Sequence, residues 1–258
     1  MAALAVQGTT GFAQDDAEAL AKKLANPISS LVSVPLQLNY DENIGPSEDG
    51  SMLRLNIQPV LPFSINDDWN LISRTILPVV DQDDVPLKGI GESGLGDIVQ
   101  SLFLSPKEAT DNGWIWGAGL VFLLPTASED LLGSEQWGIG PTAVALKQAG
   151  PWTVGGLVNH IESFAGEDHR SDVSATFLQP FVSYVTKTKT TLGVNLESTY
   201  DWESEEWSVP VNFTISQMLK MGSQIFQLGV GARYWADAPD HGPDGWGGRV
   251  QLTFLFPK

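Results

Sequence analysis

The segment TTLGVNLESTYD, residues 190–201, alternates apolar and polar side chains along its length. Leu192 and Leu196 fall on one face of an extended chain, whereas Asn195 and Glu197 fall on the other. A period of two residues is typical of a β-strand with one apolar and one polar face. The same alternation recurs at 31–40, 53–63, 207–216, 225–235 and 249–256. The pattern therefore predicts a β-sheet protein.

Extended segments of this kind follow one another along the chain, separated by clusters of turn-forming residues. A strand that crosses a membrane needs roughly 9–11 residues, and each segment is long enough. The twelve predicted strands cover residues 30–41, 52–65, 69–81, 95–105, 114–125, 137–148, 152–163, 173–186, 190–201, 207–219, 225–236 and 246–256. The side-chain phase of 69–81, 95–105 and 137–163 is ambiguous, so no facing is assigned there. The even number of strands favours an up-and-down barrel.

Composition excludes several classes of protein. The 258 residues carry a formal net charge of −17, which argues against nucleic acid as a partner because phosphate binding requires a basic surface. The chain has no cysteine, which removes disulfides and thiolate metal sites. It also has no run of about 18 apolar residues, the signal of a membrane-spanning helix. Hydrophobic residues nevertheless make up 42% of the chain, too many for a disordered protein.

Alternating faces fit either a soluble β-sandwich or a barrel in a membrane, and the membrane is favoured by two features of the side chains. The polar faces carry mainly Asn, Gln, Ser, Thr and Gly, whereas a face in water would hold more Lys and Glu. Aromatic residues lie at strand ends, as in the belts at the two membrane–water interfaces. The predicted belt residues are Tyr40, Phe63, Trp69, Trp114, Trp137, Trp152, Phe164, Tyr200, Trp202, Trp207, Trp235 and Trp246.

The connections between predicted strands alternate in charge. Every second connection, from 41–51 to 236–245, is acidic, and these six hold 21 Asp and Glu against Lys88 and Arg170. The intervening turns are mostly short and hold four acids against five lysines. Long loops at one end and short turns at the other are typical of outer-membrane barrels. We therefore expect an all-β, membrane-type antiparallel barrel of about twelve strands in the outer membrane of a Gram-negative bacterium, with apolar side chains facing lipid.

An N-terminal region precedes the predicted barrel, which is expected to span residues 30–258. Residues 1–13, MAALAVQGTTGFA, resemble the remnant of a secretory signal peptide. Residues 14–29 are a lead-in with a predicted short helix, in which Glu18 and Lys22 are spaced for an ion pair. The helix either stays in the periplasm or plugs the lumen.

Several short motifs resemble the outer-membrane proteins of the MetA-pathway-of-phenol-degradation family. They are LANPISSLVSVP (24–35), NIQPVLP (56–62), DWNLISRTILP (68–78), GLGDIVQSLFLSP (94–106), WGIGPTAVALKQAGPW (137–152), NHIESFAG (159–166), FLQPFVS (177–183), ESTYDW (197–202) and TFLFPK (253–258). The resemblance implies a bacterial outer-membrane β-barrel linked by name to the uptake of aromatic compounds, and it carries no catalytic motif. The C-terminus departs from the usual aromatic last residue of such barrels, since Phe256 is followed by Pro257 and Lys258.

Polar positions on the inward face of the strands are the candidates for function. Six of them are candidates for a lumen constriction: Arg54, Asn56, Gln58, Glu197, Arg233 and Arg249. Arginine and glutamate that face each other across a lumen would screen solutes by size and dipole. In the other interpretation the same charges form a packed salt-bridge network that closes the barrel. The sequence leaves both open.

The function expected is a passive outer-membrane channel for small organic solutes, aromatic or hydrophobic ones included, with no cofactor, no metal and no catalytic residue. The expected partners are outer-membrane lipids and lipopolysaccharide, with divalent cations at the acidic loops, and the barrel-assembly machinery during biogenesis. One alternative is a lipid-modifying enzyme in the barrel wall, which requires His160 and Ser163 within hydrogen-bond reach. The others are a structural barrel with a closed lumen and a soluble secreted β-protein such as a lectin.

Overall fold

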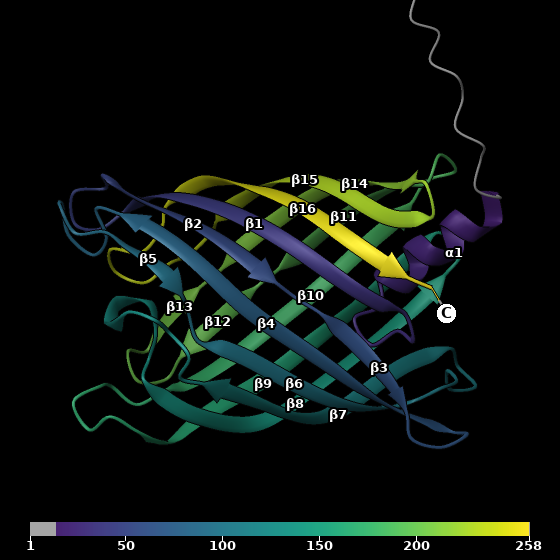
Figure 1. Cartoon of the computed structure of the whole chain (residues 1–258), viewed down its shortest axis with the longest axis horizontal. Coiled ribbons are helices and arrows are strands. Elements are labelled where there is room, and N and C mark those ends of the chain that lie inside the picture. The colour runs from purple at the N-terminus through teal and green to yellow at the C-terminus, as the bar shows by residue number, and fades with distance from the viewer. Residues whose placement is uncertain (1–13, 258) are drawn as a thin grey trace, which may run out of the picture.

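A closed antiparallel β-barrel with a short helix before its first strand makes up the structure. This computed structural model describes residues 14–257, so the predicted signal-peptide segment 1–13 lies outside the described part of the chain. Figure 1 shows the long connections at one end of the barrel and the short turns and the C-terminus at the other. The predicted membrane-type antiparallel barrel is confirmed.

All twelve predicted strands are present, and four of them are interrupted by one or two residues. The continuous strands are β1 (Val32–Ile44), β4 (Trp69–Asp83), β7 (Trp114–Leu124), β8 (Gln136–Ala149), β9 (Trp152–Gly166), β10 (Ser174–Val185), β15 (Gln224–Trp235) and β16 (Gly245–Phe256). The interrupted ones are β2 (Gly50–Ile57) with β3 (Val60–Ser64), β5 (Glu92–Leu95) with β6 (Ile98–Pro106), β11 (Thr190–Leu196) with β12 (Ser198–Asp201), and β13 (Glu206–Ser208) with β14 (Pro210–Met221). One long connection contains a single 3-10 turn, η1 (Asp130–Leu132).

The barrel closes because the last strand returns to the first. β16 pairs antiparallel with β1 from Val32 opposite Phe256 to Tyr40 opposite Gly248. Each other strand pairs with its neighbours in the chain order. Lipid offers no hydrogen-bond partner to a backbone, and a closed sheet leaves no unpaired edge within the bilayer.

Apolar side chains of the strands face outward, as the alternation predicts. Leu192, Ile215 and Leu228 are 45%, 49% and 43% exposed on the outer surface. On the same sheet, Asn212 and Arg233 point into the barrel and are buried. An outer surface of this kind is stable against hydrocarbon. In the described part of the chain no helix has the length and apolar character needed to cross a membrane.

Aromatic side chains form a belt at each end of the outer surface. At the end with the long connections, the contacting rings are Tyr200 with Trp202 and Trp207, and Tyr234 with Trp246. At the other end they are Trp69 with Trp116, and Trp152 with Tyr184. Trp235 is an exception among the predicted belt residues, because its indole Nε1 donates a hydrogen bond to Asp41 in the barrel interior.

Part of the inner surface is apolar, which explains why three predicted segments had no clear phase. Ile72 of β4, Phe103 of β6, Leu146 of β8 and Leu157 of β9 are buried inside the barrel in one cluster with Val60. These strands therefore carry apolar residues on both faces, toward lipid and toward the interior. The inner wall from β11 through β16 to β2 is mainly polar.

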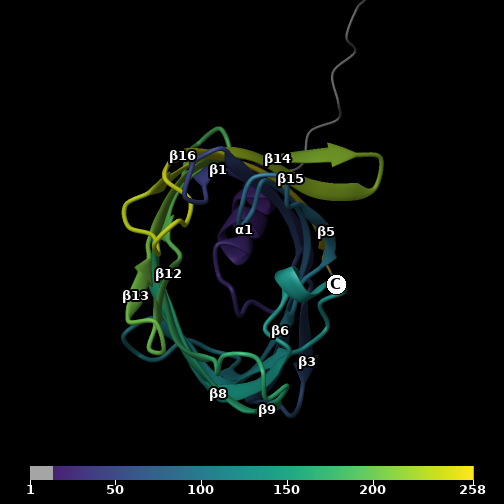
Figure 2. The same ribbon diagram turned by 90° about the vertical axis from the view of Figure 1, so that its left-hand side faces the viewer.

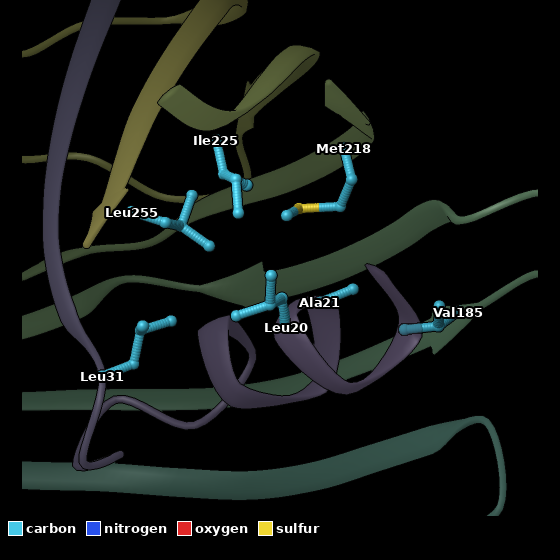
Figure 3. Packing of buried hydrophobic residues seen from close by; sticks show 7 residues of the cluster. All are labelled: Leu20, Ala21, Leu31, Val185, Met218, Ile225 and Leu255. Atoms are coloured by element: carbon cyan, nitrogen blue, oxygen red, sulfur yellow. The ribbon is translucent and has the colours of Figure 1, made fainter. Parts of the chain in front are cut away.

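The helix α1 (Gln14–Leu24) lies inside the barrel at the end with the short turns (Figures 1 and 2). Figure 3 shows Leu20 and Ala21 of the helix in one cluster with Val185, Ile225 and Leu255 of the surrounding strands. Of the two places that the sequence allowed for the helix, the structure thus shows the lumen.

Polar contacts hold α1 to the turns around it. The side-chain amide of Gln148 donates to the backbone carbonyl of Lys22 at 2.8 Å. Glu18 forms the expected ion pair with Lys22 within the helix, at 2.9 Å, and one with Lys189 of the turn between β10 and β11, at 3.6 Å. After the helix, Ile28 packs into the apolar cluster of the inner wall, so the lead-in crosses the lumen before β1 begins.

Replacing Ile215 by arginine tests which face of the sheet meets lipid. The residue lies at the middle of β14 on the outer surface, so the buried charge should destabilise the folded barrel by about 2–4 kcal/mol. Ser204→Arg, in the exposed connection between β12 and β13, is the matched control and should leave the stability unchanged. Urea unfolding in lipid vesicles measures both. Equal stabilities would contradict the assignment of this face to lipid.

Candidate functional site

Two arginines of neighbouring strands stand on the polar inner wall. Arg233 of β15 lies opposite Gly247 of β16, and Arg249 of β16 lies opposite Gly231 of β15. Because glycine has no side chain, each guanidinium has room to lie along the wall over the partner strand. Alternation predicts that both arginines point inward, and the glycines opposite them leave the space that their side chains need.

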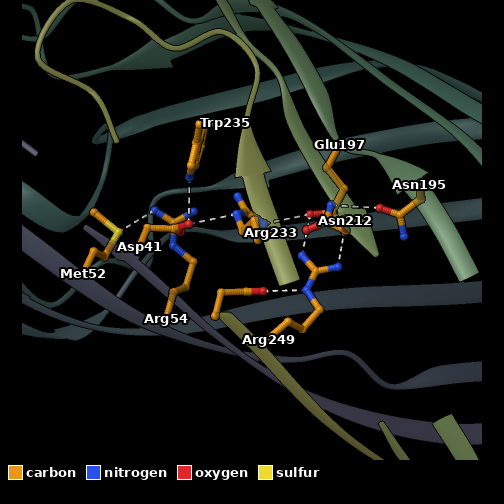
Figure 4. Close-up of polar contacts among 10 residues, drawn as sticks. Asp41, Met52, Arg54, Asn195, Glu197, Asn212, Arg233, Trp235 and Arg249 are labelled. Carbon is orange, nitrogen blue, oxygen red and sulfur yellow. Dashed lines mark hydrogen bonds and ion pairs between the residues drawn. The ribbon is translucent and has the colours of Figure 1, made fainter. Parts of the chain in front are cut away.

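Glu197, in the break between β11 and β12, joins the two arginines (Figure 4). Its carboxylate accepts hydrogen bonds from Nη1 and Nη2 of Arg249 at 3.0 and 2.8 Å, and from Nη1 of Arg233 at 3.1 Å. Two-pronged contacts between guanidinium and carboxylate are strong and directional. In the sheet, β14 and β15 lie between β11 and β16, so these bonds span a concave part of the wall.

Asp41 of β1 and Asn39 extend this cluster, which we call the lumen network. Oδ1 of Asp41 lies 2.9 Å from Nε of Arg233 and accepts a hydrogen bond from Nε1 of Trp235 at 2.8 Å. The Trp235 ring lies 4.8 Å from the guanidinium carbon of Arg233, a favourable cation–π contact. Oδ1 of Asn39 accepts from Nε of Arg249 at 2.7 Å.

The charges of the lumen network are largely removed from water. The side chains of Arg249, Arg233 and Asp41 are 2%, 7% and 7% exposed, and that of Glu197 is 19% exposed. Buried ions are tolerated only when partners satisfy them, because desolvation of an unpaired ion costs several kcal/mol. Two acids balance two arginines here, so the network is neutral and fixes the geometry of this part of the wall.

The structure brings together three of the six predicted site residues, Glu197, Arg233 and Arg249, and bonds them directly to one another. Arg54 of β2 lies beside the lumen network, with Nη2 at 3.0 Å from Sδ of Met52 (Figure 4). The remaining two, Asn56 and Gln58, line a cavity on the side of the network that faces α1.

Three site residues were missed by the sequence analysis: Asp41, Trp235 and Arg74. The prediction ends the first strand at residue 41 and counts Asp41 among the loop acids, whereas β1 continues to Ile44. Extending the alternation from Asn39 by two residues would have turned Asp41 inward. Arg74 lies in a segment whose phase was ambiguous because isoleucines flank it on its own face, and Trp235 was taken as a belt residue.

The cavity lies between the lumen network and α1 and has a volume of about 390 Å³. Its polar lining includes Gln37, Asn56, Gln58 and Arg74. Its apolar lining includes Ile76, Phe177 and Phe181, together with Leu24 of α1. We call this space the lumen cavity. It offers a small organic molecule both hydrogen-bond partners and an apolar surface.

The pair required for a lipid-modifying enzyme is not formed by His160 and Ser163. Nδ1 of His160 lies 2.9 Å from Oγ1 of Thr176, whereas Oγ of Ser163 bonds to Asp172 at 3.3 Å. An odd spacing along β9 puts the two side chains on opposite faces of the strand. Among residues 14–257, no three His, Asp or Glu side chains gather closely enough to hold a metal ion.

Comparisons with known proteins show similar folds. No family model and no curated protein matches the chain. The crystal structure of the COG4313 outer membrane channel from Pseudomonas putida F1 has a TM-score of 0.69 at 15% identity, over 88% of this chain and 96% of that one. The NanC porin has a TM-score of 0.52 at 9% identity, over 88% and 100%. The outer membrane phospholipase of Salmonella typhi has 0.51 at 10% identity, over 92% and 98%.

At these identities the likeness concerns the fold alone, and this fold carries both channels and an enzyme. A lipid bilayer is nevertheless the one environment that fits the closed barrel, its apolar outer surface and its two aromatic belts. The chain is a β-barrel of the bacterial outer membrane.

Replacing Glu197 by glutamine tests the energetic role of the lumen network. The substitution leaves Arg249 and Arg233 short of a buried counter-charge, so the barrel should lose about 3–5 kcal/mol of unfolding free energy. Glu162→Gln removes a carboxylate that is 61% exposed, and this control should cost less than about 1 kcal/mol. Urea unfolding followed by tryptophan fluorescence gives both values. A loss at position 197 no larger than the control would show that the network is solvated.

Proposed function

We propose that the barrel is a passive channel for small organic solutes, and that α1 closes it in the resting state. The observation that carries this proposal is the lumen cavity, a space within the barrel that has one polar and one apolar wall. An apolar wall lowers the cost of dehydrating a hydrophobic or aromatic solute, and the amides of the other wall replace water at its polar atoms. Such a path serves solutes that a purely water-filled pore would not favour.

We further propose that the chain belongs to the MetA-pathway-of-phenol-degradation family. The order of the short motifs from residue 24 to the C-terminus supports this assignment. The barrel's likeness in fold to an outer membrane channel is compatible with it.

The helix α1 has the contacts expected of a removable closure. Among residues 18–24, whose side chains the structure describes, its apolar side inserts Leu20 and Ala21 into the cluster of inner-wall residues, with Leu24 packed beside them. The polar contacts from these described residues to the barrel include one amide hydrogen bond, from Gln148, and the ion pair of Glu18 with Lys189. A short helix held in this way can leave the barrel end without breaking any strand pairing, because the sheet closes through β1 and β16 without it.

Replacing Leu20 by glutamate tests whether α1 closes the channel. Leu20 is buried among apolar side chains, so a carboxylate there should displace the helix and raise the single-channel conductance severalfold. Ala19→Glu places the same charge on the exposed neighbouring position and should leave the conductance near that of the wild type. Planar-bilayer recordings measure both.

The outcomes of this pair separate the channel from a closed structural barrel. A rise for L20E alone supports closure by α1. Heat-modifiability on gels establishes that both variants are folded. If the wild type and both folded variants fail to conduct ions and fail to cause swelling of solute-loaded liposomes, the proposed channel function is wrong.

The ion pairs of Glu18 predict a dependence on pH. The hydrogen bond and charge of Lys22, with a smaller contribution from Lys189, lower the pKa of Glu18 from its ordinary value of 4.5. Lys22 belongs to α1 itself, so only the pair with Lys189 joins the helix to the barrel. The docking contribution of that pair is present at neutral pH and is lost as the pH falls below 4.5 through the lowered pKa. The wild-type conductance should therefore rise in acid, modestly because the pair is exposed. Glu18→Gln should show a smaller rise, and an identical pH response in the two proteins would exclude this pair as the cause.

A further inference from the structure

The central part of the lumen carries the opposite sign of charge from the whole protein. The chain has a net charge of −17, yet the middle of the inner wall holds four arginines against two carboxylates. The arginines are Arg54, Arg74, Arg233 and Arg249, and the carboxylates are Asp41 and Glu197. Both carboxylates are bound by Arg233 and Arg249 in the lumen network. Arg54 and Arg74 remain as excess positive charge.

Of these two, Arg74 is the arginine that lines the lumen cavity. It lies on β4 opposite Ser101 on one side and Val60 on the other. Its hydrogen bond within the described chain is a long one, 3.5 Å from Nη2 to Oε1 of Gln58. A guanidinium group has five N–H donors. Most of the donor capacity of Arg74 is therefore left for a molecule in the cavity.

Apolar side chains line the same cavity as Arg74. Val60, the register partner of Arg74, belongs to the buried cluster that also contains Ile72, two residues before Arg74 on the same face. Phe177 and Phe181 pack against that cluster and line the same cavity. The guanidinium of Arg74 and the rings of Phe177 and Phe181 thus line one space of about 390 Å³. This space has room for a single six-membered ring and its substituent.

We infer that the lumen cavity binds small aromatic carboxylates, with the carboxylate on Arg74 and the ring against Phe177 and Phe181. The inference rests on the proposed channel function and names the substrate class for it. A carboxylate accepts two parallel hydrogen bonds from a guanidinium, and the ring covers apolar wall that water otherwise wets. A neutral aromatic leaves the guanidinium without an anion, and a small anion without a ring leaves the apolar wall uncovered.

Calorimetric titration of the purified full-length barrel in detergent micelles tests the inference with three probes. Benzoate has both ring and charge, benzamide has the ring alone, and acetate has the charge alone. We expect benzoate to bind at least about ten-fold more tightly than either of the others, since hydrogen bonds to charged groups are the stronger ones. Equal binding of benzoate and benzamide by the wild-type protein would overturn the inference.

Variants assign the preference to Arg74. Arg74→Gln should bring the affinity for benzoate down to that for benzamide, and Arg74→Lys should retain part of the preference because it keeps the charge but loses the paired donors. Lys147→Gln, on the exposed outer face of β8, removes the same charge outside the cavity and should change nothing. Heat-modifiability on gels establishes that each variant is folded. A full preference for benzoate in folded R74Q would refute the assignment.

Bilayer recordings keep this inference distinct from the channel proposal. Benzoate added to a chloride solution should reduce the small current that wild-type channels pass while α1 is docked, and leave the corresponding current through R74Q unaffected. Equal reduction in both proteins would count against Arg74 as the binding group. If no current passes in any protein while the titrations show the Arg74-dependent preference, the channel proposal fails and the binding site stands.

Discussion

The constraint on which the rest of the structure depends is that lipid cannot hydrogen-bond to a backbone. A sheet in a bilayer must therefore pair every strand edge, and this chain does so by returning β16 to β1. Closure gives every strand residue one of two environments, hydrocarbon or interior. Charges at the level of the bilayer have then only one stable place, which is the inner wall.

The inner wall divides between two ways of filling a small barrel. On one side, Ile72, Phe103, Leu146 and Leu157 pack into a dry cluster. On the other side, buried arginines and acids satisfy one another. The lumen cavity lies where these two regions meet, so its mixed lining follows from the way in which the barrel is packed. The helix α1 occupies the end of the same space, because that end would otherwise leave apolar side chains such as Leu255 in water.

The strands could be predicted well from the sequence because apolar and polar side chains alternate with a period of two residues wherever the interior of the barrel is polar. The sequence failed to give the phase of β4, β6 and β8, because an apolar interior places Ile72, Phe103 and Leu146 opposite lipid-facing residues of the same character. The inward arginines on β15 and β16 could be predicted from alternation alone. Their bonds to Glu197 could not, because these depend on which strands the curvature of the wall brings within reach. The position of α1 was undecided for a similar reason, since its few apolar residues fit any apolar surface.

The contrast between an acidic protein and a basic lumen has an electrostatic consequence. Acidic loops at the barrel end repel anions, but salt screens exposed charges beyond about 8–10 Å at physiological ionic strength. Arginines deep in the barrel are surrounded by protein and lipid of low dielectric constant, so their field is screened less. An anion that has passed the loops is therefore governed by the lumen charges and not by the net charge of −17. The sign of the whole chain is thus a guide to its surface, while in the proposed channel the selectivity follows from the few charges that the network leaves unpaired.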